Sequence, residues 1–269
     1  MQEVLLSFLG VFRIVAFLTW VAICVPIQVT VKFFKLRIQN ILPTYFHKVL
    51  TKYILGMRIE TQGTMSTTVP TLFLCNHMSY LDTISIASVI PTYFVAKAEV
   101  ADWPLFGYLT RLQGTLFIDR RNKKGTAEQG AAMIDVMRQQ RNIVLFPEGT
   151  STNGSEVKFF KSGLMQSVLD MNDVDVMIQP VSIACYGKNG IQNRYAWYGD
   201  MTLMPHLWTV FKTSGLRVGI TFHEPFLASR FKDRKELGEY ARKQVENGPY
   251  GIFNDEGVKT TLPLSKAVG

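Results

Sequence analysis

Short apolar runs alternate with stretches of helical periodicity over most of this 269-residue chain. Apolar runs of strand length predict strands at residues 71–75, 93–97, 115–119, 143–146, 176–185 and 216–222. Apolar residues at helical spacing predict helices near residues 81–89, 102–111, 125–140, 164–171, 203–212 and 232–246. The alternation indicates an α/β fold, with a mixed sheet flanked by helices. The last residues of the chain, with Gly248, Pro249 and Gly257, are typical of a loop or a loosely docked tail.

The N-terminal region has a different pattern. Residues 14–31 carry no charge and Arg13 is the single charge within residues 4–31, so this apolar run just reaches the length that spans a bilayer. Arg13 and Pro26 divide the run into pieces that could instead form a re-entrant hairpin in one leaflet, with Arg13 reaching the headgroups. We favour the re-entrant form over the spanning one, and a helix buried in a soluble core is the third alternative. The start, Met-Gln-Glu, and the lack of an A-x-A sequence after the run argue against a cleaved signal peptide. The sequence predicts a membrane segment at residues 1–40 and a second domain at residues 41–269.

The distribution of charge supports a membrane partner. Lys and Arg outnumber Asp and Glu by 29 to 21, and residues 1–60 hold seven of these basic residues against Glu3 and Glu60. Basic groups beside an apolar segment are attracted to anionic headgroups, and the positive-inside rule puts the second domain on the cytoplasmic side of the membrane. No nucleic-acid-binding signature is present, so nucleic acid is not expected as a partner.

Composition excludes further classes of protein. A chain with 47% hydrophobic and 19% charged residues is too apolar to be mainly disordered. Its three cysteines, Cys24, Cys75 and Cys185, have neither metal-site nor CxxC spacing, which excludes a zinc module and a disulfide scaffold.

Candidate chemistry begins where the strand at 71–75 gives way to a helix, which is where α/β folds place their sites. Ser79 and Asp82 have the spacing of a helix capping box. If His77 lies on the loop before the helix, Asp82 can accept from one imidazole nitrogen and leave the other free as a general base. The alternative is that Asp82 only complements the helix dipole and His77 is structural.

Two further strand ends carry candidate residues. Arg120 follows the strand at 115–119 and suits bidentate binding of a phosphate, or alternatively pairs with Asp119 or Glu128. The sequence Pro147-Glu148-Gly149-Thr150 forms a tight turn, in which Gly149 would let backbone N–H groups approach a ligand as an oxyanion hole requires, or the segment is an ordinary turn.

Taken together, four ordered blocks carry a resemblance: Asn76-His77-x-Ser-x-x-Asp82, Phe117-Ile-Asp-Arg120, Phe146-Pro-Glu-Gly-Thr150 and Ile178-Gln-Pro180-Val-Ser-Ile183. This set resembles the four motifs of the glycerolipid acyltransferase family, and within it most of all the lysophosphatidate acyltransferases. The resemblance covers about residues 60 to 230.

The resemblance implies transfer of a fatty acyl group from acyl carrier protein or coenzyme A to the hydroxyl of 1-acylglycerol-3-phosphate, giving phosphatidic acid. His77 would then be the base and Asp82 its orienting residue, with Lys97 and Arg120 as phosphate ligands. Three further substrate-binding roles are implied, for Glu148, Gly149 and Thr150 in the positioning turn, and Pro180 would line the acyl site. No metal or redox cofactor is implied, because a thioester is already activated.

Two alternatives stay open at this point. The acceptor could be another lysolipid, such as lyso-ornithine lipid. The chain could also be a non-catalytic lipid-binding module that keeps the fold, although such a module has no use for a poised base.

Overall fold

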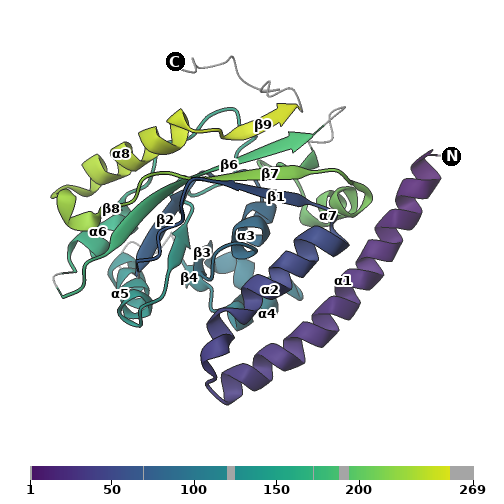
Figure 1. Ribbon diagram of the computed structural model, residues 1–269, viewed down its shortest axis with the longest axis horizontal. Coiled ribbons are helices and arrows are strands. Elements are labelled where there is room, and N and C mark those ends of the chain that lie inside the picture. Colours follow the sequence, from purple (N-terminus) through teal and green to yellow (C-terminus); the bar gives the residue numbers. More distant parts are fainter. Residues whose placement is uncertain (1, 69, 120–124, 172, 188–193, 255–269) are drawn as a thin grey trace.

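A mixed β-sheet lies at the centre of the chain, with helices on both of its faces (Figure 1). The computed structural model describes residues 2–68, 70–119, 125–171, 173–187 and 194–254. The strands are β1 (Arg58–Gln62), β2 (Thr71–Cys75), β3 (Tyr93–Lys97), β4 (Leu116–Ile118), β5 (Ile143–Leu145), β6 (Met177–Gly187), β7 (Arg217–Phe222), β8 (Phe226–Leu227) and β9 (Gly251–Asn254). The helices are α1 (Gln2–Phe33), α2 (Leu42–Val49), α3 (Tyr80–Ala87), α4 (Phe106–Gln113), α5 (Gly125–Arg138), α6 (Gly163–Leu169), α7 (Leu203–Lys212) and α8 (Arg234–Asn247). The predicted fold class is confirmed.

The sheet order is β1-β7-β6-β2-β5-β3-β4, and both β8 and β9 also pair with β6. Strands β6, β2, β5, β3 and β4 run parallel, whereas β7 is antiparallel to β6. Because neighbouring parallel strands end at the same edge, the segments that follow β2, β5 and β3 meet there. That edge holds the candidate site.

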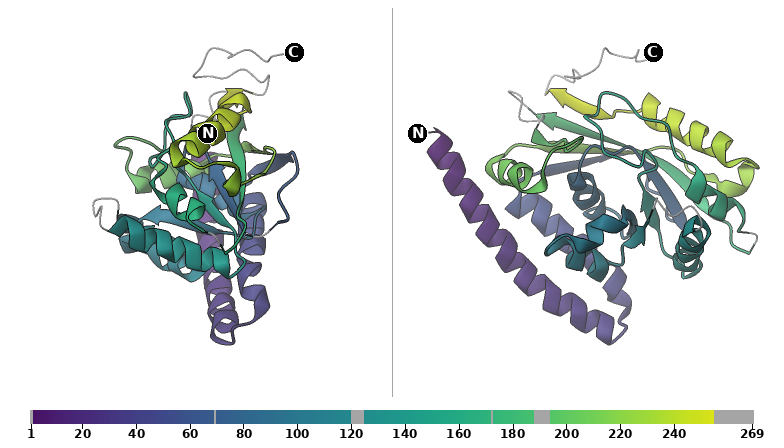
Figure 2. Two further views of the ribbon diagram at one scale, coloured as in Figure 1. Left: turned by 90° about the vertical axis from the view of Figure 1, so that its left-hand side faces the viewer. Right: turned by 180° about the vertical axis from the view of Figure 1, so that it is seen from behind.

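Period-two alternation along the strands divides the core into two layers. On one face, Phe73 and Val181 pack with residues of α3 and α7. On the other face, Leu72 and Leu74 pack with residues of α5, α6 and α8. Figure 2 shows the same arrangement from behind, with α1 outermost on the face that carries α2 and α4.

Helix α1 is continuous, which corrects two expectations. The helix passes through Pro26 without interruption, because a proline removes one backbone donor and neighbouring helices support the rest of α1. Arg13 does not reach out to headgroups, since it is only 7% exposed and its guanidinium donates to the carbonyl oxygens of Phe211 (3.2 Å) and Thr213 at the C-terminal end of α7. A cation at this position also suits the negative end of the helix dipole.

The turn of the N-terminal hairpin therefore lies after residue 33. A short 3₁₀ helix, Arg37–Asn40, leads from α1 into α2, and the two helices lie side by side. By length and composition α1 could cross a membrane, but one of its sides is held against the domain by Arg13. The division of the chain at residue 40 stays a prediction.

Strand β9 corrects a further expectation. Gly251–Asn254 pairs in parallel with the end of β6, in a region whose Gly and Pro content predicted a loop. Ile252 and Phe253 bury their side chains, at 2% and 8% exposed, and this packing outweighs the local turn propensity.

Candidate active site

His77 lies on the loop between β2, which ends at Cys75, and α3, which begins at Tyr80. Its Nδ1 is 2.8 Å from Oδ2 of Asp82 in the first turn of α3. The geometric condition for a His–Asp dyad, that His77 precedes the helix, is therefore met.

Asp82 accepts hydrogen bonds from four donors. Its Oδ2 accepts from His77 Nδ1 and from the backbone N–H groups of Met78 (2.7 Å) and Ser79 (2.9 Å). Its Oδ1 accepts from the Tyr195 hydroxyl at 2.8 Å. Asp82 thus completes the capping box with Ser79 and also contacts Nδ1 of His77, so the two contacts expected of this residue are both present. With no exposed surface, its carboxylate is fixed in place.

The hydrogen-bond network assigns the tautomer of His77. The Asp82 carboxylate can only accept hydrogen bonds, so Nδ1 of His77 must carry the proton that it donates to Oδ2 of Asp82. The lone pair of the imidazole is therefore on Nε2. The His77 side chain is 21% exposed, and its ring stacks on Phe146 with centroids 4.2 Å apart. Nε2 is therefore held in a defined direction and can take a proton from a hydroxyl group.

Glu148 lies beneath His77 and ties its backbone to the turn after β5. Oε1 of Glu148 accepts from the His77 N–H at 2.7 Å, and Oε2 accepts from the Lys158 N–H at 3.0 Å. Burial raises the pKa of Glu148 to about 7, and these two backbone hydrogen bonds oppose the rise. The geometry supports the positioning role expected of Glu148.

Gly149 holds the turn after β5, and its own N–H group is engaged within that turn; its expected role, to let backbone N–H groups approach a ligand, stays a prediction. Its φ of +76° places it in the left-handed region that favours glycine. Its N–H donates to the carbonyl oxygen of Phe146 at 3.1 Å and closes the turn. Gly149 therefore shapes the turn, and it still lines the active-site cavity beside Thr150.

Asn76 clamps the loop that carries His77 onto β6. Its side-chain amide donates to the Ile183 carbonyl oxygen at 3.1 Å and accepts from the Ile183 N–H at 2.7 Å. These two bonds continue the β2–β6 ladder by one more pair beyond Cys75. The position of His77 is thus fixed from both sides, by Asn76 and by Glu148.

A cavity of about 500 Å³ opens beside His77, within the range of about 300–1,000 Å³ typical of small-molecule sites. Its walls are mainly apolar and include Trp103 and Trp197. Lys97, which is exposed at the end of β3, and Thr150 also line it. The structure thus brings His77, Lys97, Gly149 and Thr150 to one cavity.

Two residues that were predicted to bind substrate are not found in the lining of this cavity. Pro180 pairs with Leu74 in the middle of the sheet and does not line the cavity, so the expectation that it lines the acyl site is wrong as far as this cavity is concerned. Side chains alternate along a strand, and because Val181 packs on the α3 face, Pro180 is directed to the other face. Arg120 lies outside the described residues.

Sequence reasoning missed Tyr195 and the stacking of Phe146 on His77. Tyr195 is 113 residues away from Asp82 in the chain, and nothing in its neighbourhood marks it as a partner. Phe146 stands in one of the four motifs, so its place after β5 could have indicated a contact with His77.

Comparisons with known proteins identify the family of this chain. The Acyltransferase family matches residues 57–184. The lyso-ornithine lipid O-acyltransferase of Rhizobium meliloti (strain 1021) is 32% identical over 239 residues, which cover 84% of this chain and 82% of the relative. The 1-acyl-sn-glycerol-3-phosphate acyltransferase of Neisseria gonorrhoeae is 26% identical and covers 65% of this chain and 67% of its own length.

A solved structure shares the fold. The crystal structure of the 1-acyl-sn-glycerophosphate acyltransferase from Thermotoga maritima superposes with a TM-score of 0.64 at 20% identity, covering 92% of this chain and 96% of that one. The dyad, the ordered motifs and the match over most of a relative's length lead to one conclusion. The chain belongs to the acyltransferase family.

Proposed function

We propose that this acyltransferase moves a fatty acyl group from an acyl thioester to the free hydroxyl of a lysolipid. One observation carries the proposal. His77 lines the cavity, and because its Nδ1 donates to Asp82, its Nε2 has a lone pair that can accept a proton. A base in this setting needs only a hydroxyl group and an activated carbonyl brought within reach.

The reaction then follows from the geometry. Nε2 of His77 takes the proton of the lysolipid hydroxyl as its oxygen attacks the thioester carbonyl carbon. The tetrahedral intermediate collapses with loss of the thiolate, which takes the proton back from His77 as it leaves. Asp82 holds the imidazole and stabilises its positive charge while the proton is on it.

For the acceptor, we favour lyso-ornithine lipid. The relative of that name aligns over 84% of this chain, against 65% for the glycerophosphate relative, and at higher identity. The cavity also carries opposite charges, Lys97 and Glu99, both exposed and two residues apart. An ornithine headgroup has a carboxylate and an ammonium, so it complements such a pair.

The second candidate acceptor is 1-acylglycerol-3-phosphate, the substrate expected from the motifs. The similarity to the Neisseria gonorrhoeae 1-acyl-sn-glycerol-3-phosphate acyltransferase, at 26% identity, supports this acceptor. In that case Lys97 would bind the phosphomonoester, which carries between one and two negative charges near neutral pH. Arg120 would be the second cation, and it lies outside the described residues.

Separate assays of the two acceptors test the choice between them. Purified protein is supplied with one labelled acyl thioester and with each lysolipid in turn, and kcat/KM is measured for each. We expect kcat/KM to be higher for lyso-ornithine lipid than for 1-acylglycerol-3-phosphate. Glu99→Gln should lower kcat/KM for lyso-ornithine lipid only. Higher kcat/KM for 1-acylglycerol-3-phosphate, with no effect of Glu99→Gln on either acceptor, would reverse the assignment and leave acyl transfer at His77 unaffected.

The donor and the location are also proposals. Either an acyl carrier protein or coenzyme A thioester would fit the chemistry, and the protein would act on the cytoplasmic face of the inner membrane. Support comes from the apolar residues exposed on α1, among them Phe8 and Phe12, and from the basic residues that follow this helix, Lys35 and Arg37.

A further inference from the structure

Two cations from distant parts of the chain meet near the turn of the N-terminal hairpin. Lys32, in the last turn of α1, donates from Nζ to the carbonyl oxygen of Leu112 at 3.0 Å, near the C-terminal end of α4. Arg141, between α5 and β5, donates to the hydroxyl of Tyr93, and its Cζ lies 5.1 Å from the centroid of that ring. The two contacts are neighbours, because Gly114 packs so closely against the Tyr93 ring that a β-carbon there would overlap with it.

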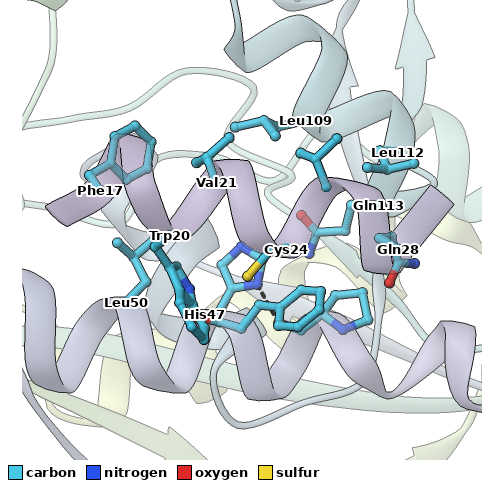
Figure 3. Close-up of a pocket in the computed structure, with 13 residues that line it drawn as sticks. Phe17, Trp20, Val21, Cys24, Gln28, His47, Leu50, Leu109, Leu112 and Gln113 are labelled. Atoms are coloured by element: carbon cyan, nitrogen blue, oxygen red, sulfur yellow. Dashed lines mark hydrogen bonds between the residues drawn. The ribbon is translucent and has the colours of Figure 1, made fainter. Parts of the chain in front are cut away.

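The end of α1 is held in this place by further contacts. Gln28 of α1 and Leu112 of α4 line the same small apolar pocket between the two helices (Figure 3). The Gln28 side chain donates to the carbonyl oxygen of Gln39 at 2.9 Å, which ties the hairpin turn to α1. Asn40, the next residue, accepts through Oδ1 from the Tyr93 hydroxyl at 2.9 Å. Asn40 is therefore beside Arg141, on the same tyrosine.

We call Lys32, Asn40 and Arg141 the turn cluster. No carboxylate of the described residues forms an ion pair with either cation. Burial lowers the pKa of Lys32, and the nearby charge of Arg141 lowers it further, as expected when two cations lie close together.

The turn cluster has hydrogen-bond donors to spare. An ammonium has three N–H groups and a guanidinium has five, and Lys32 and Arg141 each use one of them on described residues. The side-chain nitrogen of Asn40 donates to none of the residues that the structure describes. Spare donors with an excess of positive charge suit an oxyanion such as a phosphate.

The residues that follow Lys32 are aromatic and exposed. Phe33 is 78% exposed and Phe34 is 64% exposed, and their rings meet edge to face with centroids 5.1 Å apart. Exposed aromatic rings next to cations are typical of a surface at the level of lipid headgroups. A soluble anion would complement the cations alone, whereas a phospholipid complements both the cations and the rings.

The turn cluster is separate from the active site. None of its three residues lines the cavity at His77. Tyr93, which the cluster surrounds, begins β3, whereas Lys97, which lines that cavity, ends the same strand. An anion at the turn cluster would therefore occupy a different place from the acceptor headgroup.

We propose that the turn cluster binds the phosphate group of a membrane phospholipid that is not a substrate. Lys32 and Arg141 supply the positive charge, and the guanidinium offers two parallel N–H groups to one phosphate. Phe33 and Phe34 lie beside the hydrocarbon of the same lipid. The bound lipid joins α1 to the segment before β5, so it fastens the hairpin to the α/β domain at the membrane surface. The proposal does not depend on which lysolipid is the acceptor, since no step of the reaction involves the cluster.

Vesicle binding without substrates tests the proposal. Full-length protein is floated with vesicles of phosphatidylcholine, and with vesicles that also contain the anionic phospholipid phosphatidylglycerol. Wild-type protein should bind the mixed vesicles more tightly. The cluster variant, Lys32→Gln/Arg141→Gln, removes two charges from the turn cluster. The matched control, Lys35→Gln/Arg37→Gln, removes two charges from exposed positions in the same hairpin turn.

The two double variants have the same net charge, so general attraction to an anionic surface weakens equally in both. We expect the cluster variant to bind the mixed vesicles at least about tenfold more weakly than the matched control, because it also loses charge-assisted hydrogen bonds.

A charge-conserving substitution separates geometry from charge. Arg141→Lys keeps the positive charge and loses the planar fork, so we expect weaker binding to the mixed vesicles, by about threefold or more. Arg37→Lys, at an exposed position, should bind as the wild type does. This pair also decides the question if unfolding curves show that the cluster variant does not fold.

Two results would overturn the proposal. Equal binding of mixed vesicles by the cluster variant and the matched control, with no effect of Arg141→Lys, would show diffuse attraction without a site. Calorimetric binding of inorganic phosphate by wild-type protein and not by the cluster variant, with equal vesicle binding by the two, would assign the cluster to a soluble anion. Neither result bears on acyl transfer at His77, because no substrate is present in these measurements.

Discussion

The hydroxyl of Tyr195 donates a hydrogen bond to Oδ1 of Asp82 at 2.8 Å, on the side of the carboxylate opposite to His77. Tyr195 has no exposed surface, and burial together with the nearby Asp82 carboxylate raises its pKa well above the ordinary value. It is therefore a permanent neutral donor, and it fixes the carboxylate that in turn orients His77.

Removing this donor should slow catalysis without removing the base. We expect Tyr195→Phe to lower kcat by about tenfold, or about 1.4 kcal/mol in the barrier, with little change in KM. The acid limb of the kcat/KM profile should move to higher pH, because a carboxylate with one donor fewer stabilises the imidazolium more strongly. The control is Tyr186→Phe, whose ring stacks on Phe253 away from Asp82. A lower kcat with an unmoved pH profile would indicate a merely structural role for Tyr195.

Glu148 makes the stability of the protein depend on pH. Its pKa is raised from 4.5 to about 7 by burial, so the folded protein holds a proton that the unfolded chain releases. The bound proton contributes to the free energy of unfolding. Its contribution is complete below pH 4.5 and is lost as the pH rises through about 7. Relative to Glu148→Gln, which does not titrate, the wild-type free energy of unfolding should fall over this interval and then level off. Chemical unfolding in detergent across this pH range measures it, and a constant difference would contradict it.

Arg13 joins α1 to the rest of the domain. Arg13→Gln removes its donors from the buried carbonyl oxygens of Phe211 and Thr213, which should cost about 1–3 kcal/mol. Hydrogen exchange at the backbone amides of α1 should become faster. Arg37→Gln, at an exposed position in the hairpin turn, should change stability by no more than about 0.5 kcal/mol. Equal effects of the two substitutions would show that the buried contact contributes nothing.

The outer side of α1 should bind membranes. Phe8 and Phe12 are each 69% exposed, and burying a phenylalanine side chain contributes about 1.5–3 kcal/mol. The double variant Phe8→Ser/Phe12→Ser should therefore bind vesicles at least about tenfold more weakly in a flotation assay. Leu227→Ser alters an exposed apolar residue in β8, far from α1 (Figure 1), and should have no effect. Full vesicle binding by the double variant would place the membrane contact elsewhere.

The sequence predicted contacts between residues that are close together in the chain, and it missed contacts between residues that are far apart in it. His77 and Asp82 are five residues apart, and the strand-to-helix junction with its capping box constrains them to meet. Strands 71–75 and 93–97 were predicted to the residue, because buried parallel strands are continuous apolar runs.

The errors have a common cause. Arg13 in an apolar run was expected to reach lipid headgroups, and its true partners are carbonyl oxygens about 200 residues later in the chain. Pro180 was assigned to the acyl site from its motif, and the strand register directs it to the other face of the sheet. Such assignments depend on tertiary contacts, which local pattern does not encode.

The central claim is that His77 is the base of an acyl transfer to a lysolipid. The measurement is the rate of transfer from a labelled acyl thioester to lyso-ornithine lipid and to 1-acylglycerol-3-phosphate by wild-type and His77→Ala protein, with matched unfolding curves and vesicle binding. The account predicts that His77→Ala lowers the rate on the preferred acceptor by about 10²–10⁴-fold while fold and membrane binding stay intact. A well-folded His77→Ala protein that keeps more than about a third of the wild-type rate would contradict it.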